Sequence, residues 1–192
     1  YTTEHTLSLH DALPILRKFI ADRQIPESDL NLILEAAKSA PSGMNAQSWH
    51  FTVIQNKQKI EKLNSLIIES AMQSADEEMK KTLSRQKLNY FYNAPSVIIV
   101  SNEPKSSSSS TPEYDSAAAL QNIFLAAHSL GIGSCWIQIL SFIDESASLR
   151  DYLKELGVPK NYRVYGTAII GYPDGEIKTE ITKKDGTVNI VK

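Results

Sequence analysis

The segment between Pro41 and Trp49 gathers hydroxyl, amide and backbone groups in one short stretch. Ser42, Asn45 and Gln47 supply side-chain donors and acceptors close together. Several directional hydrogen bonds with little charge suit the recognition of the edge of a heteroaromatic ring. The same side chains can also satisfy the backbone of a tight connector, so the segment alone is a weak sign of a binding site.

Several familiar catalytic patterns are absent from the sequence. It contains no Walker loop, no Gly-x-Gly-x-x-Gly fingerprint, no His-Glu-x-x-His motif and no Gly-x-Ser-x-Gly turn. This argues against hydrolysis and against classical dinucleotide binding. His50 and His128 have no second ligand at metal spacing, so we predict no metal site. Cys135, the single cysteine, has no evident activating base and is interpreted as a buried structural thiol.

Three motifs, in order along the chain, resemble one family. The sequence Ala-Pro-Ser-Gly-Met-Asn-Ala-Gln-Ser-Trp, at Ala40–Trp49, resembles the Pro-Ser-x-x-Asn-x-Gln-Pro-Trp loop of nitroreductase-like FMN-dependent oxidoreductases, with Ser48 in place of a proline. Residues 126–136 resemble the end of the family's central helix and its Gly-Leu-Gly-Thr-Cys-Trp turn. Arg17-Lys18-Phe19 resembles the end of its Arg-Arg-Ser-x-Arg-x-Phe motif. With a basic tail, the resemblance spans residues 17 to about 184.

The resemblance implies FMN as the cofactor and a homodimer as the assembly. In the family the first loop reaches the flavin of the partner subunit, and the second motif faces the flavin ring. A backbone donor near flavin N5 is therefore expected from Ile137 or Gln138. Arginine suits the phosphate because its fork stays charged and makes two hydrogen bonds. The expected cofactor-binding residues are Arg17, Pro41, Ser42, Gly43, Asn45, Gln47, Ser134, Trp136, Ile137, Gln138, Lys178 and Lys183.

The N-terminal region departs from the family pattern. Leu13, Pro14 and Ile15 stand where the family has Arg-Arg-Ser, so two phosphate or ribityl ligands are expected to be missing. Residues 8–15 look like the translation of a sequencing adapter, and the region lacks clear periodicity. We interpret residues 1–16 as a non-native or disordered start and residues 17–192 as a single flavin-binding domain.

Composition indicates an ordinary globular domain and excludes some partners. The chain has 192 residues, of which 42% are hydrophobic and 22% are charged. A net charge of -2 provides no basic field, so we expect no nucleic-acid partner. No apolar run approaches the roughly 20 residues that span a bilayer, so we expect no membrane partner. One cysteine excludes an internal disulfide and favours a cytoplasmic location.

Hydrophobic patterning predicts the elements that must position these motifs. The predicted strands share short apolar runs and span residues 49–54, 96–101, 134–137 and 162–170. The predicted helices share apolar residues at helical spacing and span residues 26–40, 57–85 as two helices, 115–130 and 146–156. The 115–130 segment is apolar nearly all round, which predicts a central position. Residues 102–111, with five consecutive serines, are predicted to form a mobile surface loop.

These elements predict an α+β fold, a nitroreductase-like mixed sheet flanked by helices, in an intertwined homodimer. The implied function is an FMN-dependent oxidoreductase that uses NAD(P)H to reduce a small-molecule acceptor, such as a nitroaromatic or a quinone, by a ping-pong mechanism. Flavin carries the redox chemistry, so no catalytic side chain is expected. Two alternatives stay open: a related flavoenzyme with another acceptor, such as a dehalogenase, and a flavin-binding protein without turnover.

Overall fold

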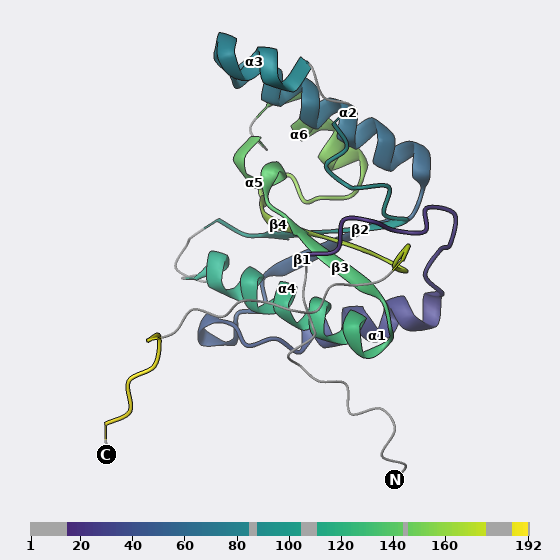
Figure 1. The fold of residues 1–192 in the computed structure, drawn as a ribbon. Helices are drawn as coiled ribbons and strands as arrows, with labels where there is room; N and C mark the ends of the chain where they lie inside the picture. Colours follow the sequence, from purple (N-terminus) through teal and green to yellow (C-terminus); the bar gives the residue numbers. More distant parts are fainter. Residues whose placement is uncertain (1–14, 85–87, 105–110, 144–145, 176–185, 192) are drawn as a thin grey trace.

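The computed structural model describes residues 15–84, 88–104, 111–143, 146–175 and 186–191. In these residues a four-stranded sheet lies between two layers of helices, as Figure 1 shows. The strands are β1 (Trp49–Ile54), β2 (Ser96–Asn102), β3 (Gly133–Ile137) and β4 (Arg163–Gly171), in the order β1-β2-β4-β3.

The helices divide between the two faces of the sheet (Figure 1). One face carries α1 (Glu27–Lys38) and α4 (Pro112–Ser129). The other carries α2 (Lys57–Ser74), α5 (Ile139–Ile143) and α6 (Ala147–Glu155), with α3 (Glu77–Ser84) beyond the end of α2. Every helix in the described part of the chain is too short or too polar to cross a membrane.

Burial of β2 on both faces follows from this layering. Val97 and Ile99 pack into the core on the α2 and α6 side, whereas Ile98 and Val100 pack into the core beneath α1 and α4. Side chains alternate across a strand, so a continuous apolar run suits a strand that is covered on both sides. The strand predicted over residues 96–101 is confirmed, and it is buried along its whole length.

The expectation of a mixed sheet is wrong for the described chain, because all three strand pairings are antiparallel. β2 and β3 run in the same direction and are joined by a crossover through α4. β4 lies between them, however, and pairs antiparallel with each. Because β4 lies between them, β2 and β3 make no parallel pairing, and the sheet of the described chain is antiparallel throughout.

The central helix begins earlier than predicted. α4 starts at Pro112 rather than Asp115, because proline is favoured in the first turn and Glu113 also suits the positive end of the helix dipole. It ends at Ser129, close to the predicted end at residue 130, and Gly131 follows with a φ of 69° and an N–H that donates to the carbonyl of His128 at 3.0 Å.

The remaining elements agree with the predictions apart from one helix. The observed β1, α1 and α6 match their predicted segments, and α2 and α3 confirm the split into two helices. α5 was not predicted, because its five residues are too few to establish a period. Residues 1–14, the serine run at 106–110 and the lysines at 178, 183 and 184 lie outside the described residues.

Candidate functional site

The loop before β1 is organised by its own polar groups. The Ser42 hydroxyl accepts a hydrogen bond from the Gln47 N–H at 3.0 Å, and the Gln47 amide donates to Asn45 Oδ1 at 2.8 Å. The Asn45 N–H donates to the Ser42 carbonyl at 3.0 Å, closing a short 3-10 turn over Gly43–Asn45. Asn45 and Gln47 are exposed, so their remaining polar atoms are available to a ligand.

Three residues of this loop have left-handed backbone conformations. The φ angles are 54° at Met44, 55° at Asn45 and 48° at Gln47. Asparagine tolerates this region, but methionine and glutamine enter it at a cost of about 1–3 kcal/mol each. Surrounding contacts must therefore hold the loop, and one is a hydrogen bond of 2.9 Å from the Gly43 N–H to the buried carboxylate of Asp115 in α4.

A second group of predicted residues meets at the outer edge of β3. The Leu16 N–H donates to the Ser134 carbonyl at 2.9 Å, and Ile15 forms an antiparallel bridge with Cys135. This pairing fixes Arg17 beside the edge strand, where its guanidinium lies 5.8 Å from the centre of the Tyr92 ring.

A cavity of about 510 Å³ opens beside Arg17. Its wall includes Lys18, Tyr90, Tyr92 and Asn93, so cationic, phenolic and amide groups face the same space. Lys18 is already paired with Asp174, at 3.4 Å. Burial raises the pKa of Tyr90, and neighbouring Tyr92 raises it further, so this phenol stays protonated at neutral pH.

The end of β3 is tied down by the side chain of Gln138. The Trp136 indole N–H donates to Gln138 Oε1, while the Gln138 amide donates to the Ser141 hydroxyl and, at 3.2 Å, to the Tyr165 carbonyl. This network connects β3 with the first turn of α5 and with β4. The Gln138 carbonyl accepts hydrogen bonds from the Ser141 N–H at 3.0 Å and from the Ser141 hydroxyl at 2.8 Å, so the backbone N–H is the part of Gln138 that can face a ligand.

Strand register separates Ile137 from Gln138 as ring contacts. In a strand, the N–H and C=O groups of successive residues alternate between the two edges. Since the Ser134 carbonyl faces outward to Leu16, the polar groups of Ile137 face β4, where Ile137 pairs with Thr167. Of the two expected backbone donors, Gln138 is therefore the better placed.

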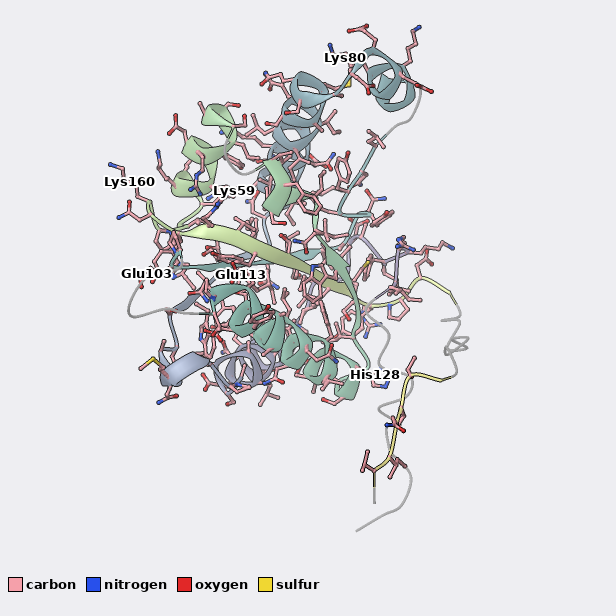
Figure 2. All side chains as sticks on the ribbon, turned by 90° about the vertical axis from the view of Figure 1, so that its left-hand side faces the viewer. Lys59, Lys80, Glu103, Glu113, His128 and Lys160 are labelled. Carbon is pink, nitrogen blue, oxygen red and sulfur yellow. The ribbon has the colours of Figure 1, made fainter. Side chains whose placement is uncertain are left out.

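The 41–48 loop and Arg17 lie near opposite ends of α4, whereas Trp136 packs against Phe124 in the middle of the helix. The loop contacts Asp115 in the first turn of α4, whereas Ser134 and Arg17 lie just beyond its C-terminal end. Glu113 and His128 mark these two ends in Figure 2. With 18 residues, α4 is about 27 Å long. One chain therefore brings Pro41, Ser42, Gly43, Asn45 and Gln47 together, and separately Arg17, Ser134, Trp136, Ile137 and Gln138.

The remaining site predictions concern the tail lysines and a metal site. Lys178 and Lys183, the expected phosphate ligands of the tail, lie outside the described residues. The described residues contain no cluster of three or more His, Cys, Asp or Glu side chains that could hold a metal ion. Sequence reasoning did not single out Asp115 or Tyr92 as site residues. An acid at a buried position of an apolar helix was the available signal for Asp115.

Comparison with known proteins identifies a family and several solved structures that resemble the chain. The nitroreductase family model matches residues 16–172. A nitroreductase of Bacteroides fragilis, solved with bound FMN, is 42% identical, has a TM-score of 0.86 and aligns over 93% of this chain and 94% of its own. A second FMN-bound nitroreductase, from Desulfitobacterium hafniense, is 26% identical, with a TM-score of 0.78 over 92% of this chain and 93% of its own.

A sequence relative points the same way. An Archaeoglobus fulgidus protein, provisionally named an NADH dehydrogenase/NAD(P)H nitroreductase, is 33% identical over 158 residues, which are 81% of this chain and 79% of that protein. The predicted resemblance is thereby confirmed, and the chain belongs to the nitroreductase family.

Proposed function

We propose that this protein is an FMN-dependent oxidoreductase that takes electrons from NAD(P)H. The observation that carries the proposal is its similarity, over 93% of the chain, to the FMN-bound nitroreductase of Bacteroides fragilis. The nicotinamide donor rests on the provisional NAD(P)H nitroreductase names of the Archaeoglobus and Methanothermobacter relatives.

The residues of this chain fit FMN. Arg17 is exposed at the cavity beside β3, and within the described chain its guanidinium forms no ion pair. It can therefore meet the phosphate, with Lys178 and Lys183 as proposed partners. The exposed amides of Asn45 and Gln47 suit the polar edge of the ring, and we assign the Gln138 backbone N–H as the donor near N5.

Bound FMN would supply the redox chemistry, accepting hydride from NAD(P)H and passing electrons to an acceptor. The chain binds the nucleotide, orients its ring and limits access to it. Cys135 stays out of the chemistry, because burial raises the pKa of its thiol more than the nearby charge of Arg17 lowers it. No side chain is assigned as an acid or a base.

A homodimer would let residues from the two separated groups contact the same flavin. Most of the length of α4 separates Arg17 from Asn45, so we propose that a flavin held by both residues takes Arg17 from one chain and Asn45 from its partner. Exposed apolar residues support this: Val188, Ile190 and Val191 are 79%, 74% and 86% exposed, and Figure 1 shows the segment 186–191 extending away from the sheet and helices. A second copy would cover such residues.

Titration with FMN tests the proposal. The purified protein should quench added FMN fluorescence with a stoichiometry of one flavin per chain. Rates with NADPH and a quinone or nitroaromatic should then give parallel double-reciprocal lines, as a ping-pong mechanism requires. A protein that neither carries nor binds FMN would refute the cofactor assignment. Intersecting lines would refute only the ping-pong order.

A further inference from the structure

We propose that Asp115 is a positioning residue that holds the loop over residues 41–48 in its ligand-binding conformation. The inference rests on the proposed function, because the ligand of that loop is taken to be the flavin of the partner subunit. Asp115 does not touch the flavin in this account. It acts through Gly43 and the turn that follows it.

The carboxylate of Asp115 connects three parts of the chain. Its Oδ1 accepts a hydrogen bond from the Gly43 N–H at 2.9 Å and another from the Thr111 hydroxyl at 2.9 Å. Gly43 begins the 3-10 turn, and Thr111 is the residue that precedes α4. One oxygen therefore fixes the start of the loop to the start of the central helix.

Burial makes this contact costly to lose. Asp115 is 4% exposed, and its Oδ2 is buried without a hydrogen-bond partner in the described chain. A carboxylate is rarely placed in such a position unless its charge is compensated. The compensation comes from charge-assisted bonds to Oδ1 and from the positive end of the α4 dipole, since Asp115 lies in its first turn.

The hydrogen bond to Asp115 holds the loop in an unfavourable backbone conformation. Met44, Asn45 and Gln47 all have positive φ angles, and Met44 is 86% exposed, so packing of its side chain cannot hold the turn. The hydrogen bond from the Gly43 N–H to Asp115 joins the loop to a core helix through a buried side chain. Without it, the loop would relax toward ordinary backbone conformations and misplace Asn45 and Gln47.

Ser116 offers a matched control in the next position of α4. It is fully buried, and its hydroxyl accepts a hydrogen bond from the Asn102 amide at 3.3 Å. It belongs to the same helical turn as Asp115 but contacts β2 rather than the loop. A variant at Ser116 therefore perturbs the same end of α4 and leaves the loop anchor in place.

The experiment compares Asp115→Ala, Asp115→Asn and Ser116→Ala with the wild-type protein in two measurements. Hydrogen exchange of the Gly43 amide is followed in the flavin-free protein, and the dissociation constant of FMN is measured by fluorescence titration. Asp115→Ala should speed exchange at Gly43 and weaken FMN binding by about tenfold or more. Asp115→Asn retains the accepting oxygen and should stay within about threefold of wild type. Ser116→Ala should change neither measurement, even where it lowers the melting temperature.

The outcomes separate this inference from the proposed function. Unchanged Gly43 exchange in Asp115→Ala would overturn the positioning role, and so would an equal loss of FMN affinity in Ser116→Ala. If the wild-type protein binds no FMN, the proposed function fails, while the exchange data still decide whether Asp115 holds the loop. If Asp115→Ala fails to fold, Asp115→Leu takes its place, because leucine keeps a similar volume and removes both carboxylate oxygens. It should speed Gly43 exchange, and unchanged exchange would overturn the role.

Discussion

Arg17 places a permanent positive charge beside the cavity that Tyr90, Tyr92 and Asn93 line. If this cavity receives the FMN phosphate, Arg17→Ala should weaken FMN binding about tenfold or more, because a hydrogen bond to a charged group contributes roughly 1.5–3 kcal/mol. The measurement is an FMN titration at matched salt. Lys18→Ala is the control and should stay within about twofold, since Lys18 already pairs with Asp174. Equal losses of FMN affinity in the two variants would show that binding depends on the positive charge of this region and not on a specific contact with Arg17.

Cys135 gives a prediction about pH. The thiol is 2% exposed, and burial raises its pKa while Arg17 lowers it less. The neutral thiol therefore persists to higher pH in the folded protein than in the unfolded chain. Alkylation by iodoacetamide should be slower in the native protein at pH 8 than in urea, and its rise with pH should be displaced upward. Coinciding pH profiles in the two states would contradict the burial effect.

Residue types in the sequence indicated the loop and the β3 residues, but not what anchors them. Asn45 and Gln47 were recognisable because polar residues in a turn are informative in themselves. Asp115 was recognisable only as an acid near the start of a helix. Its bond to Gly43 depends on how α4 packs beside the loop, which is a long-range contact that no local pattern encodes.

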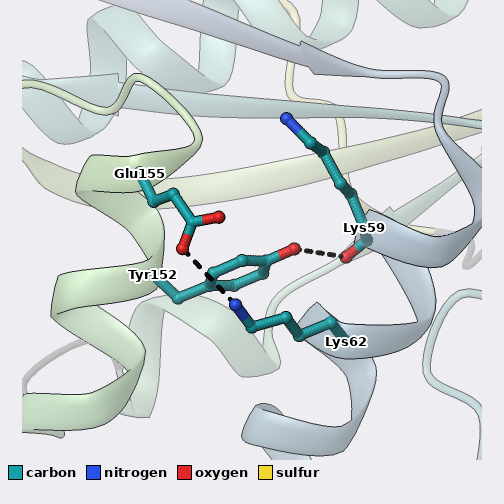
Figure 3. A network of polar contacts seen from close by, with 4 residues as sticks. All are labelled: Lys59, Lys62, Tyr152 and Glu155. Carbon is teal, nitrogen blue, oxygen red and sulfur yellow. Dashed lines mark hydrogen bonds and ion pairs between the residues drawn. The ribbon is translucent and has the colours of Figure 1, made fainter.

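At the scale of elements, α2 and α6 are joined by a polar cluster remote from the proposed site (Figure 3). The Tyr152 hydroxyl donates to the Lys59 carbonyl at 3.1 Å, and Lys62 lies 4.0 Å from the centre of the Tyr152 ring while pairing with Glu155 at 3.4 Å. Tyr152→Phe removes only the hydroxyl and should lower the free energy of unfolding by about 1 kcal/mol.

Urea denaturation measures this change, and FMN titration provides the contrast. Because the cluster contacts neither the 41–48 loop nor Arg17, Tyr152→Phe should leave FMN affinity within about twofold of wild type. A large loss of affinity would mean that the α2 and α6 layer positions the flavin. Lys62→Ala tests the exposed ion pair separately and should cost less than about 1 kcal/mol.

Strong periodicity predicted the long elements well. β2 was identifiable because its run from Val97 to Val100 is apolar throughout, and α4 because few of its positions are polar. The antiparallel order of the sheet was not predictable in the same way. It depends on β4 inserting between β2 and β3, a pairing between strands far apart in the sequence.

At the scale of the whole molecule, the dimer predicts that two defective chains can restore each other. One variant carries Arg17→Ala, and the other carries Ser42→Ala with Asn45→Ala. In a mixed dimer, one site would combine both defects, whereas the other would receive intact Arg17 from one chain and an intact loop from its partner. Activity should therefore rise when the two variants are unfolded, mixed and refolded together.

Refolding each variant alone is the control and should restore no activity. About half of the dimers in an equimolar mixture contain one chain of each variant, and each of these has one intact site. Roughly a quarter of all sites are then intact, so roughly a quarter of the wild-type activity is expected. Activity no greater than the sum of the separate variants would show that Arg17 and the loop serve the same chain's flavin, or that no shared site exists.

The central claim is that NAD(P)H reduces a flavin bound by this chain, and anaerobic stopped-flow spectroscopy tests it most directly. The protein is loaded with FMN and mixed with NADPH or NADH, and the absorbance of oxidised flavin near its visible maximum is followed. Complete bleaching is expected on the timescale of steady-state turnover, followed by rapid recovery when a quinone or nitroaromatic is added. Bleaching much slower than turnover, or the absence of bleaching with both nucleotides, would contradict it and favour a flavin-binding protein without NAD(P)H-dependent turnover.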